Sequence, residues 1–366
     1  MTKPSTTSGS AAAAVEPTPP EPRAARVPRR CTISDVAAAA GVSRSAVSFV
    51  LSDRPGVRLP EATRQRILEA AERVGYRRNA LGRALRSGRV DAVGIIAPLS
   101  VMVGDPDAPG GVYYKDLTVA LAAAAFEAGL NPLLMSEEPR RHISLADLSD
   151  RRVDGVIVVS KANSETFVEE AASAGVPCVT INRDVGEWRV QTDNVRGGRL
   201  AVEHLVGLGH RRIAYLAYDD PSSVPGRQRR DGYVAALADA GLRPVPAEPL
   251  HFQDPDAVRA ALRDPAGPTA VCCFNDELAV WLLDRCREEG VRVPDDLSVV
   301  GFDNNVLAVT ARPRLTTVRS PLAELARTAL SLFEQQQRGG APPPAPVLVE
   351  PDLVVRDSTA APSSRG

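Results

Sequence analysis

Residues 32–52 read TISDVAAAAGVSRSAVSFVLS, and the interpretation of the N-terminal part of the chain depends on this stretch. Thr32 can cap a first helix, and Asp35 lies three residues later, as in a capping box. Gly41 permits a tight turn that a side chain would obstruct, and Ser43 can cap a second helix. Apolar residues recur at helical spacing on both sides of the turn. The stretch therefore predicts a helix-turn-helix.

The second helix of such a motif is the part that enters the major groove of DNA, with its N-terminal end leading. The side chains expected on its outer face are Arg44, Ser45, Ser48 and Phe49. Arg44 suits a bidentate contact to guanine. Phe49 can either make apolar contact with a thymine methyl or pack in the core of the motif, and the sequence leaves both open.

Two further helical segments follow. A third helix is expected over residues 60–76, opened by Pro60. Its side chains expected to pack inward are Ile67, Leu68, Ala71 and Val74. Residues 77–89, RRNALGRALRSGR, are basic and favour a helix but carry few large apolar side chains. We expect this segment to become ordered on DNA, with Leu85 inserted between base steps of the minor groove.

The distribution of charge agrees with a DNA-binding N-terminal part. The chain of 366 residues has a net charge of -1, but residues 1–90 hold 16 Lys and Arg against 7 Asp and Glu, and the remainder holds 28 against 38. A basic end can neutralise phosphates while an acidic body avoids nonspecific contact with nucleic acid.

The sequence shows no signal for secretion and no membrane span. Prolines interrupt the start of the chain before any apolar core of a secretory signal develops, and no stretch approaches the ~20 apolar residues of a membrane span. We therefore expect a cytoplasmic protein with no membrane partner.

Changes in composition and hydrophobic pattern divide the chain into five parts. Residues 1–30 are rich in Pro, Ala, Ser and Thr and are expected to be disordered. The helix-turn-helix domain spans 31–76, a hinge or linker spans 77–90, a core spans 91–357, and a flexible tail spans 358–366. In the core, short runs such as AVGIIA, GVIVVS, PCVTIN, RIAYLAY, AVCCFN and SVVGFD alternate with longer helical patterns. This alternation predicts an α/β core of two doubly wound parallel-sheet subdomains that face each other across a cleft, behind an all-α head.

These motifs, in this order, resemble the LacI/GalR family of bacterial transcription regulators. The resemblance covers residues 31–357 and rests on DVAAAAGVS, on the hinge RNALGRAL, and on the core blocks FNDELAV and LSVVGFDNN. It implies a core of the periplasmic-binding-protein type and no cofactor. It also implies a sequence-specific regulator, more often a repressor than an activator, that binds a pseudo-palindromic DNA operator as a homodimer. A small-molecule effector, a sugar or a related polyol, would control it from the core cleft.

The resemblance also implies two sets of site residues. The DNA-contacting set is Thr32, Ser34, Ser43, Arg44, Ser45, Ser48, Phe49, Tyr76, Asn79, Gly82 and Leu85. The effector-contacting set is Tyr113, Asn182, Arg229, Asn275 and Asp303. The second set suits a polyhydroxylated ligand, because a carboxylate accepts from hydroxyls, an amide donates and accepts, and a guanidinium donates as a fork. The sequence departs from the family pattern at Ala46, Gly82, Asn182 and Ser320, where threonine, alanine, aspartate and glutamine are usual.

Structural roles remain open for several of these residues. Asn275 could cap the helix that follows it, and Asp303 could cap its own following segment. Arg229 could pair with a surface carboxylate, and Tyr113 could belong to the core. The residues expected to be structural rather than metal ligands are His204, His210, Cys272 and Cys273.

Two other functions are compatible with a core of this type. A free sugar-binding transport protein would be expected to carry a signal peptide and would not need a basic head. An enzyme on a nucleotide-binding fold would be expected to show G-x-G-x-x-G after its first strand, a P-loop, a G-x-S-x-G turn or a Ser, His and Asp constellation, and the sequence shows none of them. We therefore expect no enzymatic activity. A regulator whose cleft has lost control by a small molecule stays open as an alternative.

Overall fold

The computed structural model describes residues 31–52, 59–76, 89–103, 110–136, 143–148, 152–159 and 164–363. The chain forms two compact units, residues 1–79 and residues 80–366, which are described separately below. They are called the head and the core. Within the described ranges, no helix combines the length and the apolar character that crossing a bilayer requires.

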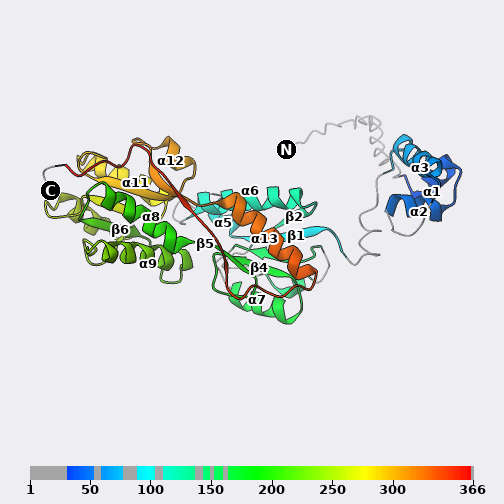
Figure 1. Cartoon of the computed structure of the whole chain (residues 1–366), viewed down its shortest axis with the longest axis horizontal. Coiled ribbons are helices and arrows are strands. Elements are labelled where there is room, and N and C mark those ends of the chain that lie inside the picture. The colour runs from blue at the N-terminus through cyan, green and yellow to red at the C-terminus, as the bar shows by residue number, and fades with distance from the viewer. Residues whose placement is uncertain are drawn as a thin grey trace, which may run out of the picture. The chain divides into compact units, whose positions relative to one another are not determined.

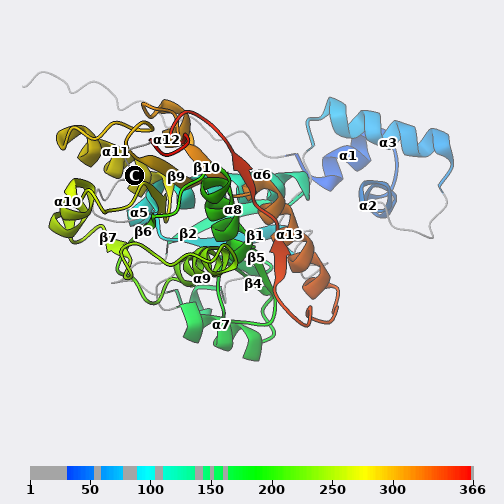
Figure 2. The ribbon, with the colours of Figure 1, turned by 60° about the vertical axis from the view of Figure 1, so that its left-hand side comes forward.

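The head is a three-helix unit, and the predicted helix-turn-helix is confirmed (Figure 2). It consists of α1 (Ile33–Ala40), α2 (Arg44–Ser52) and α3 (Glu61–Arg73). The backbone N–H and the hydroxyl of Thr32 donate to the Asp35 carboxylate at 2.7 and 2.8 Å. Gly41 has a φ of 65°, which favours glycine, and the hydroxyl of Ser43 accepts from the N–H of Ala46 at 3.1 Å. The local signals of this stretch therefore agree with its fold.

The core of the head contains one residue that the sequence interpretation misplaced. Val36, Val47 and Ile67 are fully buried against one another's helices. Leu68, which was expected to pack inward, is 41% exposed, and Ala70 is buried in its place. The reason is geometric, because Leu68 lies one position, about 100° of helix rotation, beyond Ile67, whereas Ala70 lies three positions on and returns to the same face.

The first subdomain of the core is built on a six-stranded parallel sheet in the order β11-β5-β4-β3-β1-β2 (Figure 1). The strands are β1 (Ala92–Ala97), β2 (Asn131–Ser136), β3 (Val156–Val158), β4 (Cys178–Ile181), β5 (Arg189–Thr192) and β11 (Val347–Val349). Helices α6 (Gly111–Glu127) and α13 (Leu322–Gln337) pack on one face, and α7 (Ser164–Ser173) packs on the other. Short helices α5 (Leu99–Met102) and η1 (Leu145–Leu148) lie in the connections.

The second subdomain repeats this architecture with the sheet β12-β10-β9-β8-β6-β7. Its strands are β6 (Ile213–Ala217), β7 (Leu250–His251), β8 (Ala270–Cys273), β9 (Ser298–Asp303), β10 (Thr316–Arg319) and β12 (Asp352–Val354), of which β12 is antiparallel to β10. Helices α8 (Asn194–Gly207) and α9 (Val224–Asp239) cover one face, and α10 (Pro255–Arg263), α11 (Asp276–Glu288) and α12 (Val306–Thr310) pack on the other. The predicted fold class, with two doubly wound subdomains, is confirmed.

The chain crosses between the two subdomains after β5, after β10, and between β11 and β12. These crossovers explain why the two sheets are close to one another although each is assembled from separate stretches of sequence. The carboxyl ends of β4, β6, β8 and β9 lie near the space between the sheets, where parallel sheets bind ligands.

Residues 358–360 are ordered, although the sequence interpretation placed them in a flexible tail. Ser358 is fully buried, its hydroxyl donates to the carbonyl of Val299 at 2.6 Å and accepts from the N–H of Thr316 at 2.8 Å, and its carbonyl accepts from the N–H of Val299. The carbonyl of Ala360 lies 2.9 Å from Nε2 of His210. The flexible-tail expectation is therefore wrong for these residues, because they satisfy backbone groups of β9 and β10 that would otherwise be buried without partners.

Candidate functional site

The outer surface of α1 and α2 presents most of the residues expected to contact DNA. Thr32, Ser34, Ser43, Arg44 and Ser45 are exposed, and Ser48 and Phe49 are half-buried. The hydroxyl of Ser43 already caps α2, so its proton is the group that remains to donate outward.

Tyr76 is half-buried against the core of the head, beyond the end of α3. Asn79, Gly82 and Leu85 lie outside the described residues. The proposed hinge contacts are therefore predictions from the sequence alone.

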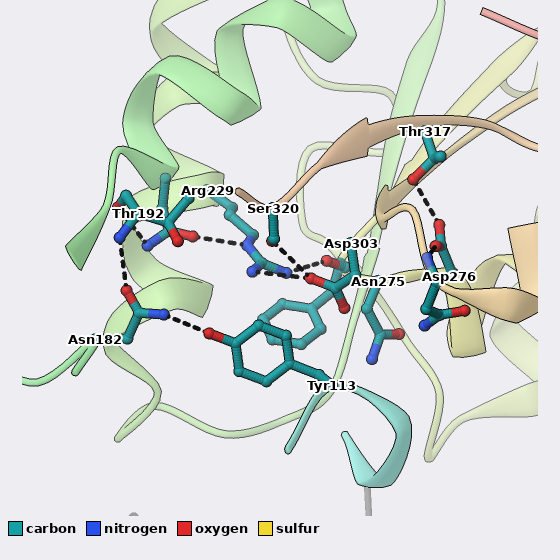
Figure 3. Close-up of polar contacts among 12 residues, drawn as sticks. Tyr113, Asn182, Thr192, Arg229, Asn275, Asp276, Asp303, Thr317 and Ser320 are labelled. Carbon is teal, nitrogen blue, oxygen red and sulfur yellow. Dashed lines mark hydrogen bonds and ion pairs between the residues drawn. The ribbon is translucent and has the colours of Figure 1, made fainter. Parts of the chain in front are cut away.

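The second candidate site is a cavity of about 740 Å³ between the two subdomains, called here the central cavity. Its lining includes every residue of the predicted effector set, namely Tyr113, Asn182, Arg229, Asn275 and Asp303. These residues come from the first turn of α6, the end of β4, the middle of α9, the N-cap of α11 and the end of β9 (Figure 3). Tertiary structure thus brings together five residues that are spread over 190 positions of sequence.

A buried ion pair stands at the centre of this arrangement. Nη2 of Arg229 lies 3.5 Å from Oδ1 of Asp303, and each side chain is only 4% exposed. Nε of Arg229 donates to Oδ1 of Asn194 at 3.0 Å, and Nη1 donates to the carbonyl of Phe274 at 2.6 Å. The guanidinium carbon also lies 3.6 Å from the centre of the Phe302 ring. Arg229 therefore pairs with a buried carboxylate, and the alternative of a surface partner is wrong.

The environment of Asp303 raises the pKa of its carboxyl group above the ordinary value. Burial raises the pKa of Asp303 to about 6, while Arg229 and the hydroxyl of Ser320, which donates at 3.1 Å, act in the opposite direction. The backbone of Asp303 has a φ of 105°, an unusual value for a residue with a side chain. Asn305, not Asp303, caps the following helix by accepting from the N–H of Leu307. The carboxylate is thus available to the central cavity and is not used as a cap.

Asn182 and Tyr113 form a second polar pair on the first-subdomain side. Nδ2 of Asn182 donates to the Tyr113 hydroxyl at 2.7 Å, and Oδ1 of Asn182 accepts from the N–H of Thr192 at 2.9 Å (Figure 3). The side-chain amide thus donates on one side and accepts on the other. The Tyr113 ring meets Tyr114 edge-on and also packs against the core of the subdomain, so the residue is both a core contact and a lining residue.

Asn275 likewise has two roles. Its Oδ1 accepts from the N–H of Leu278 at 2.9 Å, which caps α11, and the residue also lines the central cavity. Lining residues that the sequence interpretation missed include Arg183, Tyr218 and Phe274. Tyr218 and Phe274 directly follow the ends of β6 and β8, and Arg183 lies one residue beyond the residue that follows β4. Their position at or just after the ends of the apolar runs is the signal that could have identified them.

The histidines and adjacent cysteines have structural surroundings. His210 is buried between the hydroxyls of Thr269 and Ser298, and burial lowers its pKa. Cys272 and Cys273 point to opposite faces of the second sheet, each into an apolar cluster. Among the residues that the structure describes, no group of three or more His, Cys, Asp and Glu side chains could hold a metal ion.

Comparison with known families gives two matches along this chain. Residues 32–79 match the description "Bacterial regulatory proteins, lacI family", and residues 202–359 match a periplasmic binding protein-like domain. The chain is 33% identical over 345 residues to the HTH-type transcriptional regulator DegA of Bacillus subtilis, which covers 90% of this chain and 98% of that protein. It is also 33% identical over 353 residues to the HTH-type transcriptional regulator MalR of Streptomyces coelicolor, covering 91% of this chain and 98% of that protein.

Solved structures show the same similarity. The lac repressor dimer bound to operator and the anti-inducer ONPF superposes with a TM-score of 0.73 at 25% identity, covering 91% of this chain and all of that chain. The complex of the transcriptional regulator CelR with cellobiose gives a TM-score of 0.62 at 29% identity, covering 90% of this chain and 100% of that chain.

Proposed function

The chain belongs to the LacI family of bacterial regulatory proteins, which are DNA-binding transcriptional regulators, and from this premise we propose that it is a repressor controlled by a small molecule. It binds a pseudo-palindromic operator as a homodimer, and its effector binds in the central cavity. One observation carries the proposal: a head with exposed Arg44 and Ser45 shares a chain with a core whose cavity is lined by a buried Arg229–Asp303 ion pair. No catalytic activity is part of the proposal, and a regulator of chromosomal genes acts in the cytoplasm.

The proposed contacts to DNA follow the exposed face of the head. Residues Thr32, Ser34, Ser43, Arg44, Ser45, Ser48, Phe49 and Tyr76 contact the operator, together with Asn79, Gly82 and Leu85 of the hinge. Arg44 at the start of α2 is the side chain best placed to discriminate a base, because it is exposed and α2 leads with this end into the groove. The serines donate to phosphates and to base edges.

The homodimer is supported by an apolar surface on the first subdomain. Leu133 and Leu134 on edge strand β2 are exposed, and so are Val119 and Phe126 on the neighbouring helix α6. An edge strand with exposed leucines beside an exposed phenylalanine is a surface that a soluble protein covers with a partner. A second copy of the chain is the occupant that we propose, and the lac repressor, a similar structure, is described as a dimer.

The proposed effector is a sugar or a related polyol. Asp303 can accept from hydroxyls, Asn275 can donate and accept, and Tyr113 offers an aromatic ring from the first subdomain. A similar protein, CelR, is described in complex with cellobiose. The volume of the central cavity lies within the range of roughly 300–1,000 Å³ that is typical of small-molecule sites.

Two measurements test this proposal. A selection of random duplexes against the purified protein at moderate salt is expected to enrich an inverted repeat, and a screen of sugars and nucleosides is expected to raise the melting temperature with at least one sugar. Enrichment of no inverted repeat contradicts the operator-binding function. If an inverted repeat is enriched and no sugar changes either stability or operator affinity, the sugar effector is wrong. A response to nucleosides alone would reassign the effector class.

A further inference from the structure

One contact joins the two subdomains beside residues that line the central cavity. Glu277 lies in the first turn of α11, in the second subdomain, and its carboxylate reaches the start of α6, in the first. Oε2 of Glu277 accepts from the N–H of Gly110 at 2.8 Å, and Oε1 accepts from the N–H of Val112 at 3.1 Å. Both oxygens of one carboxylate are thus used by backbone groups of the opposite subdomain.

The chemistry of a helix N-terminus explains why a carboxylate fits there. The first N–H groups of a helix have no partners within that helix, and the helix dipole makes this end positive. The N-cap of α6 is Gly110, which has no side chain to satisfy these groups and has a φ of 88° that favours glycine. Glu277 therefore supplies from the other subdomain the cap that α6 lacks in its own sequence.

This contact lies next to the residues that line the central cavity on both sides. Tyr113 immediately follows Val112 in the first turn of α6, and Asn275 precedes Glu277 by two residues as the N-cap of α11. The two hydrogen bonds consequently set the position of Tyr113 relative to Asn275. They do so across the cavity, between elements that are otherwise held by different sheets.

A second charged contact between the subdomains, Arg227–Asp184, is weaker because it is exposed to solvent. Arg227 of the second subdomain lies 3.4 Å from the carboxylate of Asp184 in the first, but both side chains are about half exposed. Exposed ion pairs contribute little because water and salt screen them, whereas two hydrogen bonds from N–H groups to one partly buried carboxylate are stronger.

We propose that Glu277 is a positioning residue of the effector site, which holds the two subdomains closed by capping α6 across the central cavity. Opening the cavity breaks both hydrogen bonds, and closing it restores them around a ligand. The equilibrium between open and closed cores therefore depends in part on this carboxylate, beside the hydrogen bond from Nε2 of Gln228 to Oε1 of Gln191 that also joins the two subdomains. The consequence for an effector rests on the proposed function, whereas the contact itself requires neither ligand nor DNA.

Hydrogen–deuterium exchange of the full-length protein, without ligand or DNA, tests the inference. Mass spectrometry reads the peptide that carries the amides of Gly110 and Val112. Glu277→Ala is expected to accelerate exchange there about tenfold, because both amides lose a charge-assisted partner and the open core becomes more populated. Glu277→Gln keeps acceptor oxygen without the charge and is expected to give an intermediate rate.

Two matched variants separate the contact from more general effects. Glu324→Ala removes an exposed first-turn glutamate from α13, and Arg227→Ala removes the exposed contact across the cavity. Both are expected to leave the exchange of the Gly110 and Val112 amides within about twofold of the unchanged protein.

Two results would overturn the inference. One is unchanged exchange at Gly110 and Val112 in Glu277→Ala. The other is an acceleration spread equally over both subdomains in the Ala and the Gln variants, which would assign Glu277 to overall stability. Neither result depends on whether the protein finds an operator or a sugar, so a failure of this inference is distinguishable from a failure of the proposed function.

Discussion

At the scale of single residues, the core depends on close contacts made by buried acidic groups. Oδ1 of Asp276 accepts from the Thr317 hydroxyl at 2.6 Å, and Oδ2 accepts from the N–H of Asn305 at 3.0 Å. Gly301 in β9 leaves room for this carboxylate, because a Cβ built on Gly301 would lie 2.2 Å from Oδ1 of Asp276. Asp276 thereby joins α11 to β10 and to the turn before α12.

Gly301→Ala is expected to lower the free energy of unfolding by about 2 kcal/mol or more, because the new methyl group must displace a buried, hydrogen-bonded carboxylate. Gly207→Ala is the matched control, since nothing lies within 4 Å of the corresponding position at the end of α8. Urea denaturation of the two variants measures the difference. Equal stability of the two would show that Asp276 can move without cost.

A second prediction concerns the pH dependence of stability. Burial raises the pKa of Asp276 to about 8, with the neighbouring Asp303 acting in the same direction. A carboxyl group in the unfolded chain has a pKa of about 4, so the folded state binds more protons between these two values and the free energy of unfolding falls as pH rises through that range. In Asp276→Asn, the contribution of Asp276 to this decrease of the free energy of unfolding is expected to disappear. In Asp295→Asn, which changes an exposed position, it is expected to remain. Melting temperatures between pH 5 and pH 9 supply the measurement, and parallel curves for all three proteins would refute the assignment.

At the scale of elements, sequence patterns predicted some parts of the fold better than others. The runs that became β1, β3, β4, β6, β8 and β9 are continuous and apolar because they are buried on both faces of a sheet. Strands such as β5, RVQT, and β7, with two residues, lack this signal, because β5 is mostly polar in sequence and β7 is too short to form an apolar run. Helix ends were predicted at Thr32 and Ser43 because caps act over three residues.

The recognition helix α2 supports a specific prediction. Arg44→Ala is expected to weaken operator binding by ~1–3 kcal/mol and to relax the preference at one base position. Arg66→Ala on α3 removes the same charge from an exposed position outside α2 and is expected to change affinity less, with no change in base preference. Binding selections with the two variants distinguish these outcomes. An unaltered base preference in Arg44→Ala would remove Arg44 from the set of base-reading residues.

At the scale of the whole molecule, the proposed function makes operator binding depend on the assembly of two copies of the chain. Phe126 is 65% exposed on α6, beside the edge strand β2. Phe126→Glu is expected to weaken the dimer by at least about tenfold, because it places an unpaired charge in a contact surface, and to weaken operator binding with it. Light scattering during gel filtration and operator titration provide the two measurements.

The control for this prediction is Val234→Glu, which adds the same charge at an exposed position of α9 in the other subdomain. It is expected to remain dimeric. If Phe126→Glu behaves like this control, the surface of α6 and β2 does not form the dimer.

The candidate site shows the same division between local and long-range information. Every predicted effector residue lines the central cavity. Asn182, Asn275 and Asp303 lie at or just beyond the carboxyl ends of parallel strands, where such sheets bind ligands, whereas Tyr113 and Arg229 come from α6 and α9. The partners of those residues were not predictable. The carboxylate that pairs with Arg229 is 74 positions away in the sequence, and the amide that Glu277 caps is 167 positions away.

The helical head and the order of strands and helices in the core could be obtained from sequence, because they depend on spacing, caps and apolar runs that act over a few residues. The expected lining residues came instead from the resemblance to the LacI/GalR family. Other features could be seen only in the tertiary structure. They are the pairing of Arg229 with buried Asp303, the burial of Ala70 instead of Leu68, the hydrogen bonds of Ser358 to β9 and β10, and the cap that Glu277 provides for α6. These contacts join distant stretches whose approach is set by the packing of whole sheets and helices, and no local pattern records which of several chemically similar partners will be within reach.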